Sequence, residues 1–195
     1  MPILAKNCEF TVLDFETTGS VPGWPVEPWQ LGMVGMANGK VLAGKSAEHF
    51  FHISPERPFN PQAPGRHAKI RDMLALAPSP AEQWPLLRPW LSKQALVAHN
   101  IGTERSILRK IAPLHRFGSW IDTLRLVRHA YPTLPSKALD EVLDALGLTE
   151  RARTLCPGRD AHDALYDAVA CAVLLEHLLA LPGWECVALD NLLTK

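Results

Sequence analysis

The stretch FTVLDFETTGS, residues 10–20, joins an apolar, strand-like run to two acidic side chains and a turn. Residues 10–15 predict a buried strand. Alternate residues of a strand point to the same face, so Asp14 and Glu16 project together. Two carboxylates this close repel, and burial raises the pKa of at least one of them. A divalent cation removes that cost, and oxygen ligands suit Mg²⁺ or Mn²⁺. The plainer alternative is a solvated strand end with two surface acids.

The composition indicates one globular domain over residues 1–195, since 47% of the chain is hydrophobic. Its 20 basic and 20 acidic residues leave no net charge, so nucleic-acid binding would depend on a local basic patch. Four scattered cysteines without CxxC spacing predict reduced thiols in a cytoplasmic protein. The N-terminus lacks a signal-peptide pattern and no apolar run approaches ~18 residues, so we expect no membrane association.

Hydrophobic periodicity predicts a hairpin followed by alternating strands and helices. Asn38-Gly39 is a two-residue hairpin signal, and prolines mark loops at 20–29 and 54–65. Ser136 is the expected N-cap of a helix that Gly147 ends. The expected strands are 10–15, 31–37, 40–42 continuing at 48–53, 95–98 and 120–121, and the expected helices are 67–76, 81–91, 103–111, 123–130, 136–146 and about 163–180. This order predicts a mixed α/β sheet with helices on both faces.

The last expected helix carries its apolar residues along one face and begins beside two candidate site residues. Five residues on a helix rotate by about 140°, so His162 and Asp167 cannot face one site from within it. We therefore expect His162 in the preceding loop, with Asp163 as the N-cap. In a competing interpretation, Asp163 and Asp167 share one helix face and form a metal-binding pair.

Three ordered motifs carry a resemblance to a known family. DFETTG at 14–19, AHNIGTE at 98–104 and HDALYDA at 162–168 are similar to the DxETTG, AHNxxFD and HxALxDA motifs of DEDDh (DnaQ-like) 3′–5′ exonucleases. NPQA at 60–63 and IDTL at 121–124 also fit, and the segment 161–184 is especially similar to bacterial exonuclease X. The resemblance implies an RNase H-like fold, a mixed five-stranded sheet flanked by helices, in a single domain with a motif-bearing core of about 8–185.

By this resemblance, the acids of the three motifs hold two divalent ions, Mg²⁺ or Mn²⁺, at the 3′ end of a nucleic acid. Asp14 is expected to bridge the ions, with Glu16, Glu104 and Asp167 as further ligands. His162 is the expected general base, since the reference pKa of an imidazole, about 6.5, lies near working pH. The residues expected to contact the terminal nucleotide are Thr17, Thr18, Gly19, His99 and Asn100.

Two features depart from the family pattern. Glu104 stands where the family has aspartate, so its carboxylate lies one methylene farther from the backbone, which admits a water-mediated metal contact or weakened activity. After Gly19, the family's apolar wedge against the terminal bases is replaced by a Pro- and Trp-rich insertion at 20–29. Trp24 or Trp29 is the expected replacement stacking surface, and packing of both rings against the loop's own prolines is the alternative.

Basic residues are concentrated between 104 and 129, where six basic and two acidic residues leave a local charge of +4. Together they would follow phosphates, whereas each alone reads as an ordinary solvated side chain. The six are Arg105, Arg109, Lys110, Arg116, Arg125 and Arg128, and a smaller group comprises Arg57, Arg66, Lys69 and Arg71.

The expected function is a metal-dependent 3′–5′ exonuclease that releases nucleoside 5′-monophosphates from single-stranded or frayed 3′ ends. DNA is the expected substrate because of the likeness to exonuclease X. Two alternatives stay open: an exoribonuclease of the RNase T or oligoribonuclease kind, and a catalytically weakened nucleic-acid-binding module, which Glu104 suggests. No base-reading motif is visible in the sequence, which predicts low sequence specificity.

Overall fold

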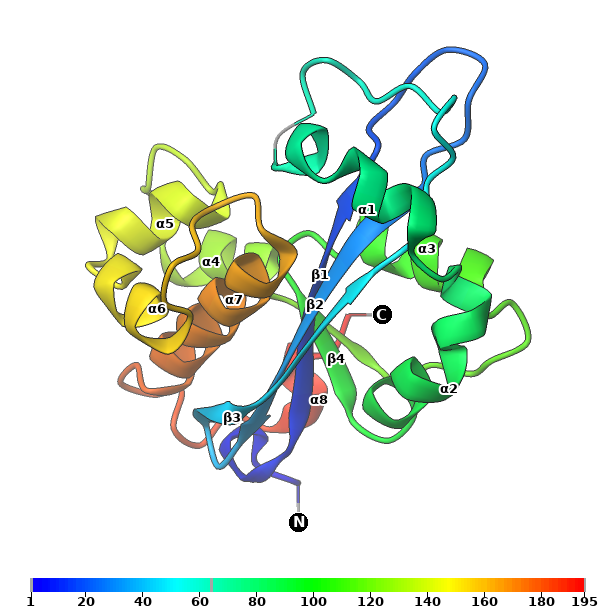
Figure 1. The fold of residues 1–195 in the computed structure, drawn as a ribbon. Coiled ribbons are helices and arrows are strands. Elements are labelled where there is room, and N and C mark those ends of the chain that lie inside the picture. The colour runs from blue at the N-terminus through cyan, green and yellow to red at the C-terminus, as the bar shows by residue number, and fades with distance from the viewer. Residues whose placement is uncertain (1, 64, 195) are drawn as a thin grey trace.

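The computed structural model describes residues 2–63 and 65–194, so Pro64 of the loop expected over 54–65 lies outside the described residues. One five-stranded sheet has the spatial order β3-β2-β1-β4-β5. Its strands are β1 (Phe10–Thr17), β2 (Pro28–Ala37), β3 (Lys40–Phe50), β4 (Ala95–Ala98) and β5 (Trp120–Asp122). β1 pairs antiparallel with β2 and parallel with β4 (Figure 1). The mixed five-stranded sheet predicted from the sequence is thus confirmed.

The β2–β3 hairpin turns at Asn38 and Gly39, whose backbones are left-handed with φ of 52° and 68°. A type I′ turn requires this conformation at both positions. β2 is longer than expected because it begins at Pro28, whereas β3 runs from Lys40 to Phe50 without the expected break and ends before the expected Ile53. Pairing with β2 keeps the polar stretch around Ser46 extended, although its own sequence gives little strand signal.

Helices connect and cover the strands, with three differences from the sequence prediction. The Ser136 cap is wrong: the chain stays extended through Ala138, so α5 begins at Leu139, and the Ser136 hydroxyl accepts the Ala138 N–H at 3.1 Å. The helix expected over 67–76 is divided into a 3₁₀ turn and α1, and α6 was not expected. The helices are η1 (Ala5–Asn7), η2 (His67–Lys69), α1 (Arg71–Leu76), α2 (Pro80–Leu91), α3 (Gly102–Ile111), α4 (Thr123–Ala130), α5 (Leu139–Ala145), α6 (Thr149–Leu155), α7 (Ala164–Leu179) and α8 (Leu189–Leu192).

Helices α4–α7 lie on one face of the sheet and α2 and α3 on the other (Figure 1), and a hydrophobic core packs beneath each group. Phe10 and Val12 of β1 pack with α4–α7, whereas Leu13 and Phe15 pack with α2 and α3. α7 is buried on nearly all sides rather than along one face, because the sheet covers one side and α4, α5 and α6 cover the other. The alternation of β1 therefore places its two acids on the α7 face.

All four cysteines are free thiols, in agreement with the sequence prediction. Among residues 2–63 and 65–194, no helix combines the length and apolar character that crossing a bilayer requires.

Candidate active site

Asp14 and Glu16 lie in the second half of β1, where Asp14 is half-buried and Glu16 is buried. Burial raises the pKa of Asp14 well above its usual range, and the charges of Asp167, Glu104 and Glu16 raise it further. Burial, followed by the charge of Asp167, raises the pKa of Glu16 to about 8. The like-charge pair expected from the sequence is present, and without a counter-charge both acids favour their protonated forms.

The first turn of α7 rests on β2 at Gly32, the residue paired with Asp14. A Cβ atom at Gly32 would lie 2.1 Å from the carbonyl oxygen of Ala164, so only glycine permits this approach. The contact brings Asp167, which lies within the first turn of α7, toward the acids of β1. Burial raises the pKa of Asp167 to about 7, although the His162 N–H donates to its Oδ2 at 3.0 Å.

His162 lies in the loop before α7, as the sequence predicts, with a left-handed backbone (φ 67°) and an exposed side chain. One ligand atom each of Glu16, His162 and Asp167 lies within 4.8 Å of the other two. A potential base and two carboxylates therefore converge from β1, the loop and α7.

Asp163 is confirmed as the N-cap of α7, because its carboxylate accepts hydrogen bonds from two backbone N–H groups of the first turn. It is also ion-paired with Arg159 at 2.8 Å and with Arg66 at 3.1 Å. Burial opposes ionisation of this carboxyl, but its bonds to Arg159 and the charge of Arg66 prevail and lower its pKa. The competing interpretation, in which Asp163 and Asp167 together bind a metal, is therefore disfavoured, because the Asp163 carboxylate is already ion-paired with two arginines.

Glu104, in the first turn of α3, is buried with 4% of its surface exposed. Its Oε2 is enclosed and has no hydrogen-bond partner among the described residues. Burial raises the pKa of Glu104 to about 7, and the charge of Asp122 adds to the rise. Because Glu104 contributes to the raised pKa of Asp14, its longer side chain lies in electrostatic contact with the acids of β1.

Asp14, Glu16, Glu104 and Asp167, here called the acid cluster, fit a divalent cation. Within residues 2–63 and 65–194, none of the four is ion-paired with a lysine or arginine. Their raised pKa values and the unpartnered oxygen of Glu104 reflect negative charge that the protein does not neutralise. Hard oxygen donors of this kind are preferred by Mg²⁺ and Mn²⁺.

The turn after β1 is packed against neighbouring loops. Gly19 has a φ of 69°, and a Cβ atom there would lie 2.7 Å from Asn60 Cβ. The Thr18 side chain is buried and its hydroxyl accepts a hydrogen bond from Arg57 at 2.8 Å. Thr17 Oγ1 accepts the Gly19 N–H at 3.3 Å. The Thr18 hydroxyl is thus used within the protein, while Thr17 and Gly19 border the end of β1 that carries the acids.

His99 and Asn100 follow β4 and differ in exposure. Nε2 of His99 donates to Lys137 O at 2.8 Å, and Nδ1 lies 2.9 Å from the Thr123 hydroxyl. Burial lowers the pKa of His99, which favours the neutral ring and a hydroxyl that donates to Nδ1. The expected contact of His99 with substrate would require one of these bonds to open. Asn100 is exposed, with a φ of 68° and its N–H bonded to Asp122 at 2.9 Å.

The two tryptophans expected at the stacking surface differ in burial. Trp29 is fully buried in β2 and its indole N–H donates to Thr17 O at 3.1 Å, so stacking by Trp29 is wrong: β2 extends into the expected loop. Trp24 is 45% exposed, and the Arg57 guanidinium lies 5.4 Å from its ring centroid. Arg57 is itself buried and Arg71 donates to two backbone carbonyls, so the smaller basic group is in part structural.

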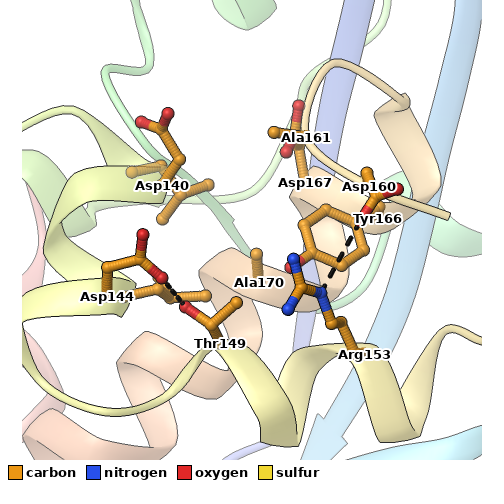
Figure 2. Close-up of a pocket in the computed structure, with 11 residues that line it drawn as sticks. Asp140, Asp144, Thr149, Arg153, Asp160, Ala161, Tyr166, Asp167 and Ala170 are labelled. Carbon is orange, nitrogen blue, oxygen red and sulfur yellow. Dashed lines mark hydrogen bonds and ion pairs between the residues drawn. The ribbon is translucent and has the colours of Figure 1, made fainter.

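A pocket of about 410 Å³ opens beside Asp167, between α5, α6 and α7 (Figure 2). Asp140 lies across this pocket from Asp167, and its charge adds to burial in raising the pKa of Asp167. Arg153 and Asp160, which are paired at 3.6 Å, line its wall. The pocket gives the acid cluster an open approach on its α5–α6 side.

Sequence reasoning missed several residues that position this site. Glu48 and Arg159 are hydrogen-bonded across 111 positions of the chain, and no local pattern marks either of them. For Gly32 a weak signal exists, because a glycine inside a strand indicates close approach of another backbone.

The RNase T family of exonucleases matches residues 11–175 of the chain. A DNA polymerase III subunit epsilon-like protein of Rhodobacter capsulatus is 30% identical over 173 residues, which cover 87% of this chain and 23% of that protein. A PolC-type DNA polymerase III of Thermotoga petrophila is 31% identical over 147 residues, 73% of this chain and 10% of that protein. The chain thus spans less than a quarter of the length of these curated relatives.

Solved structures share the fold. Exonuclease X in complex with 5′-overhanging duplex DNA has a TM-score of 0.67 and 26% identity, covering 94% of this chain and 98% of that one. E. coli exonuclease I with a dT13 oligonucleotide has a TM-score of 0.68 and 17% identity, covering 89% and 41%. Mg²⁺- and Mn²⁺-bound Pop2p of S. pombe has a TM-score of 0.71 and 12% identity, covering 95% and 88%. These likenesses confirm the predicted RNase H-like fold.

Proposed function

Because this chain belongs to the RNase T family of exonucleases, we propose that it is a metal-dependent 3′–5′ exonuclease that hydrolyses phosphodiester bonds at the 3′ ends of DNA. The observation that carries the proposal is the acid cluster, four carboxylates without a basic partner among the described residues, with His162 beside two of them. The likeness to exonuclease X, whose solved complex contains duplex DNA, supports DNA as the substrate.

Asp14, Glu16 and Asp167 would hold the divalent ions, and Glu104 would complete the site directly or through water. When bound, such ions activate a water molecule and stabilise the leaving oxygen. His162 would take a proton from the attacking water, because its exposed ring lies within reach of the same site. The water oxygen bonds to phosphorus as the bond to the 3′ oxygen breaks, so each step releases a nucleoside 5′-monophosphate.

The terminal nucleotide would contact the backbone of Thr17 and Gly19 and the exposed side chain of Asn100. The alternative of a weakened binding module rests on Glu104. Because the Glu104 carboxylate raises the pKa of Asp14 and keeps one oxygen unpartnered among the described residues, its placement favours a role in the metal site.

The test uses 5′-labelled DNA and RNA oligonucleotides of matched sequence, incubated with the protein and Mg²⁺ or Mn²⁺. We expect stepwise shortening from the 3′ end, faster on DNA, and its loss with EDTA or in Asp167→Asn. The matched control is Asp190→Asn, an exposed acid of α8 outside the site. Binding without mononucleotide release would overturn the proposal, and faster shortening of RNA would replace DNA by RNA as the substrate.

A further inference from the structure

The backbone of His162 is held in an unfavourable conformation without support from its own side chain. Its φ of 67° is left-handed, a conformation that is unfavourable for a non-glycine residue and persists only where the surroundings impose it. The ring is exposed and contributes little packing. The His162 N–H bond to Asp167 fixes one side of the peptide, so the rest of the constraint must come from neighbouring residues.

Arg159 connects the His162 loop to the sheet. Its guanidinium binds both carboxylate oxygens of Glu48 on β3, at 2.5 and 2.7 Å. The same guanidinium binds both oxygens of Asp163, the residue after His162, at 2.8 and 3.0 Å. The pair with Glu48 is bidentate, with one nitrogen on each oxygen, and such pairs fix orientation as well as distance, whereas a single nitrogen, Nη1, reaches both oxygens of Asp163. The loop is therefore anchored next to the candidate base.

Arg66 brings a second loop into the same network. It binds Glu48 at 3.0 Å and Asp163 at 3.1 Å. Its neighbour Gly65 lies against both the candidate base and the acid cluster, since a Cβ atom there would be 3.1 Å from His162 O and 3.6 Å from a Glu16 oxygen. The network thus holds both loops that border the site on this side.

The network is balanced in charge. Arg66 and Arg159 oppose Glu48 and Asp163. Each of the two carboxylates is thus ion-paired with both arginines, which leaves the network without net charge.

We propose that Arg159, together with Glu48, is a positioning residue that orients His162 for proton abstraction. This inference rests on the proposed exonuclease function. Arg159 touches no reacting group, and it acts by fixing Asp163 and, through it, the left-handed peptide of His162.

The test is a double-mutant cycle on the full chain. Arg159→Gln is expected to lower kcat by about 100-fold, the effect of a misplacement of about 1 Å, while KM changes little. Arg159→Lys restores part of the rate, because lysine keeps the charge but not the bidentate geometry. In a His162→Ala background, Arg159→Gln changes kcat by less than about twofold, since the base it orients is gone. An equal loss in both backgrounds would overturn the proposal.

A second readout does not depend on activity. Hydrogen exchange of the amides at 160–163 should accelerate in Arg159→Gln and not in the matched control Arg151→Gln, whose ion pair with Glu176 lies elsewhere on α7. If Arg159→Gln folds poorly, the double variant Glu48→Gln with Arg159→Gln, which removes both charges of that ion pair, is used instead. Unchanged exchange in this loop refutes the positioning role even if the wild type degrades DNA, whereas accelerated exchange in a protein without nuclease activity refutes the proposed function instead.

Discussion

On the α7 side of the acid cluster charged groups are paired within the protein, whereas on the α3 side they are left open. Arg159 and Arg66 share Glu48 and Asp163. Across the site, Glu104 keeps an oxygen without a partner, and neither Arg105 nor Arg109 forms an ion pair or hydrogen bond within the part of the chain that the structure describes.

This difference indicates what each side is for. Charges that are already paired hold loops in place, and a bound ligand would add no missing partner to them. Open charges beside the candidate site are available to groups from outside, and the proposed function assigns them a cation at Glu104 and phosphates at the arginines. Arg105 and Arg109 line a groove of about 470 Å³ together with His115 and Phe117, which is consistent with a strand leaving the site along α3.

Glu104→Gln should give the largest effect and tests the open side directly. Loss of a metal-binding carboxylate is expected to reduce nucleotide release by at least ~100-fold. The same change removes a buried charge, so without metal at about pH 8 the melting temperature should rise by roughly 5 °C. Calorimetry and a release assay measure the two effects. A fall in stability would show that Glu104 is satisfied by the protein after all.

The pH dependence of stability should differ in sign between the unpaired acids of the acid cluster and the paired Asp163. Without metal, Glu16 keeps its proton to about pH 8, and Glu104 and Asp167 to about pH 7, whereas unfolded carboxyls ionise near pH 4. The folded state binds more protons, so the free energy of unfolding falls between about pH 4 and pH 8. Mg²⁺ should therefore raise the melting temperature more at pH 8 than at pH 5.

Asp163 supplies the opposite case within this prediction. Its lowered pKa means that its stabilisation is present above the usual carboxyl pKa and is lost as pH falls through the lowered value. In EDTA at pH 8, Asp163→Asn should lower the melting temperature and Glu104→Gln, on the α3 side, should raise it. If both substitutions destabilise the protein, the contrast between the sides fails.

A smaller effect is expected from Arg105→Gln combined with Arg109→Gln. Removal of two phosphate contacts should weaken oligonucleotide binding by about tenfold and reduce the slope of log affinity against log salt by roughly 1.4. The rate at saturating substrate should stay unchanged. Fluorescence anisotropy over a salt series measures this, with Arg151→Gln as the control. An unaltered slope would remove the groove from the path of the strand.

Trp24 should show the smallest effect. Its exposed ring packs against the guanidinium of Arg57, which is itself buried and ion-paired with Glu27, so it joins a paired charge to an open surface. Loss of one stacked base is expected to raise KM by about fivefold in Trp24→Ala, with little change in Trp24→Phe. Neither variant should shift the melting temperature, since the ring is exposed. Steady-state kinetics on single-stranded DNA decide the matter, and an unchanged KM in Trp24→Ala would assign the ring to loop packing.

Local patterns predicted the parts of the fold that are encoded locally. The Asn38-Gly39 turn, the strand at 95–98 and the position of His162 outside α7 each depend on a few adjacent residues. The β1 acids were predictable because strand alternation alone places them on one face. The predictions that failed lie where pairing with a distant strand overrides the local sequence. β3 continues through polar residues because β2 lies beside it, and Trp29 is buried because it belongs to β2, which pairs with strands on both sides.

The network around Arg159 could not be found in the sequence. Its members come from one strand and two loops, and a charged residue on an exposed-looking strand such as Glu48 reads as ordinary solvated surface. The unpartnered oxygen of Glu104 was equally hidden, because the departure from aspartate is visible in the sequence but the enclosure of the longer side chain is not.

The glycine at position 32 means that α7, which carries Asp167, meets β2, the strand beside the acid-bearing β1, backbone against backbone. Most packed elements can adjust their spacing through side chains of different size. At Gly32, however, β2 and the first turn of α7 meet without a side chain between them. The gap between Asp14 and Asp167 is consequently set at this contact by the main chain, so a larger side chain at position 32 would move the two acids relative to one another.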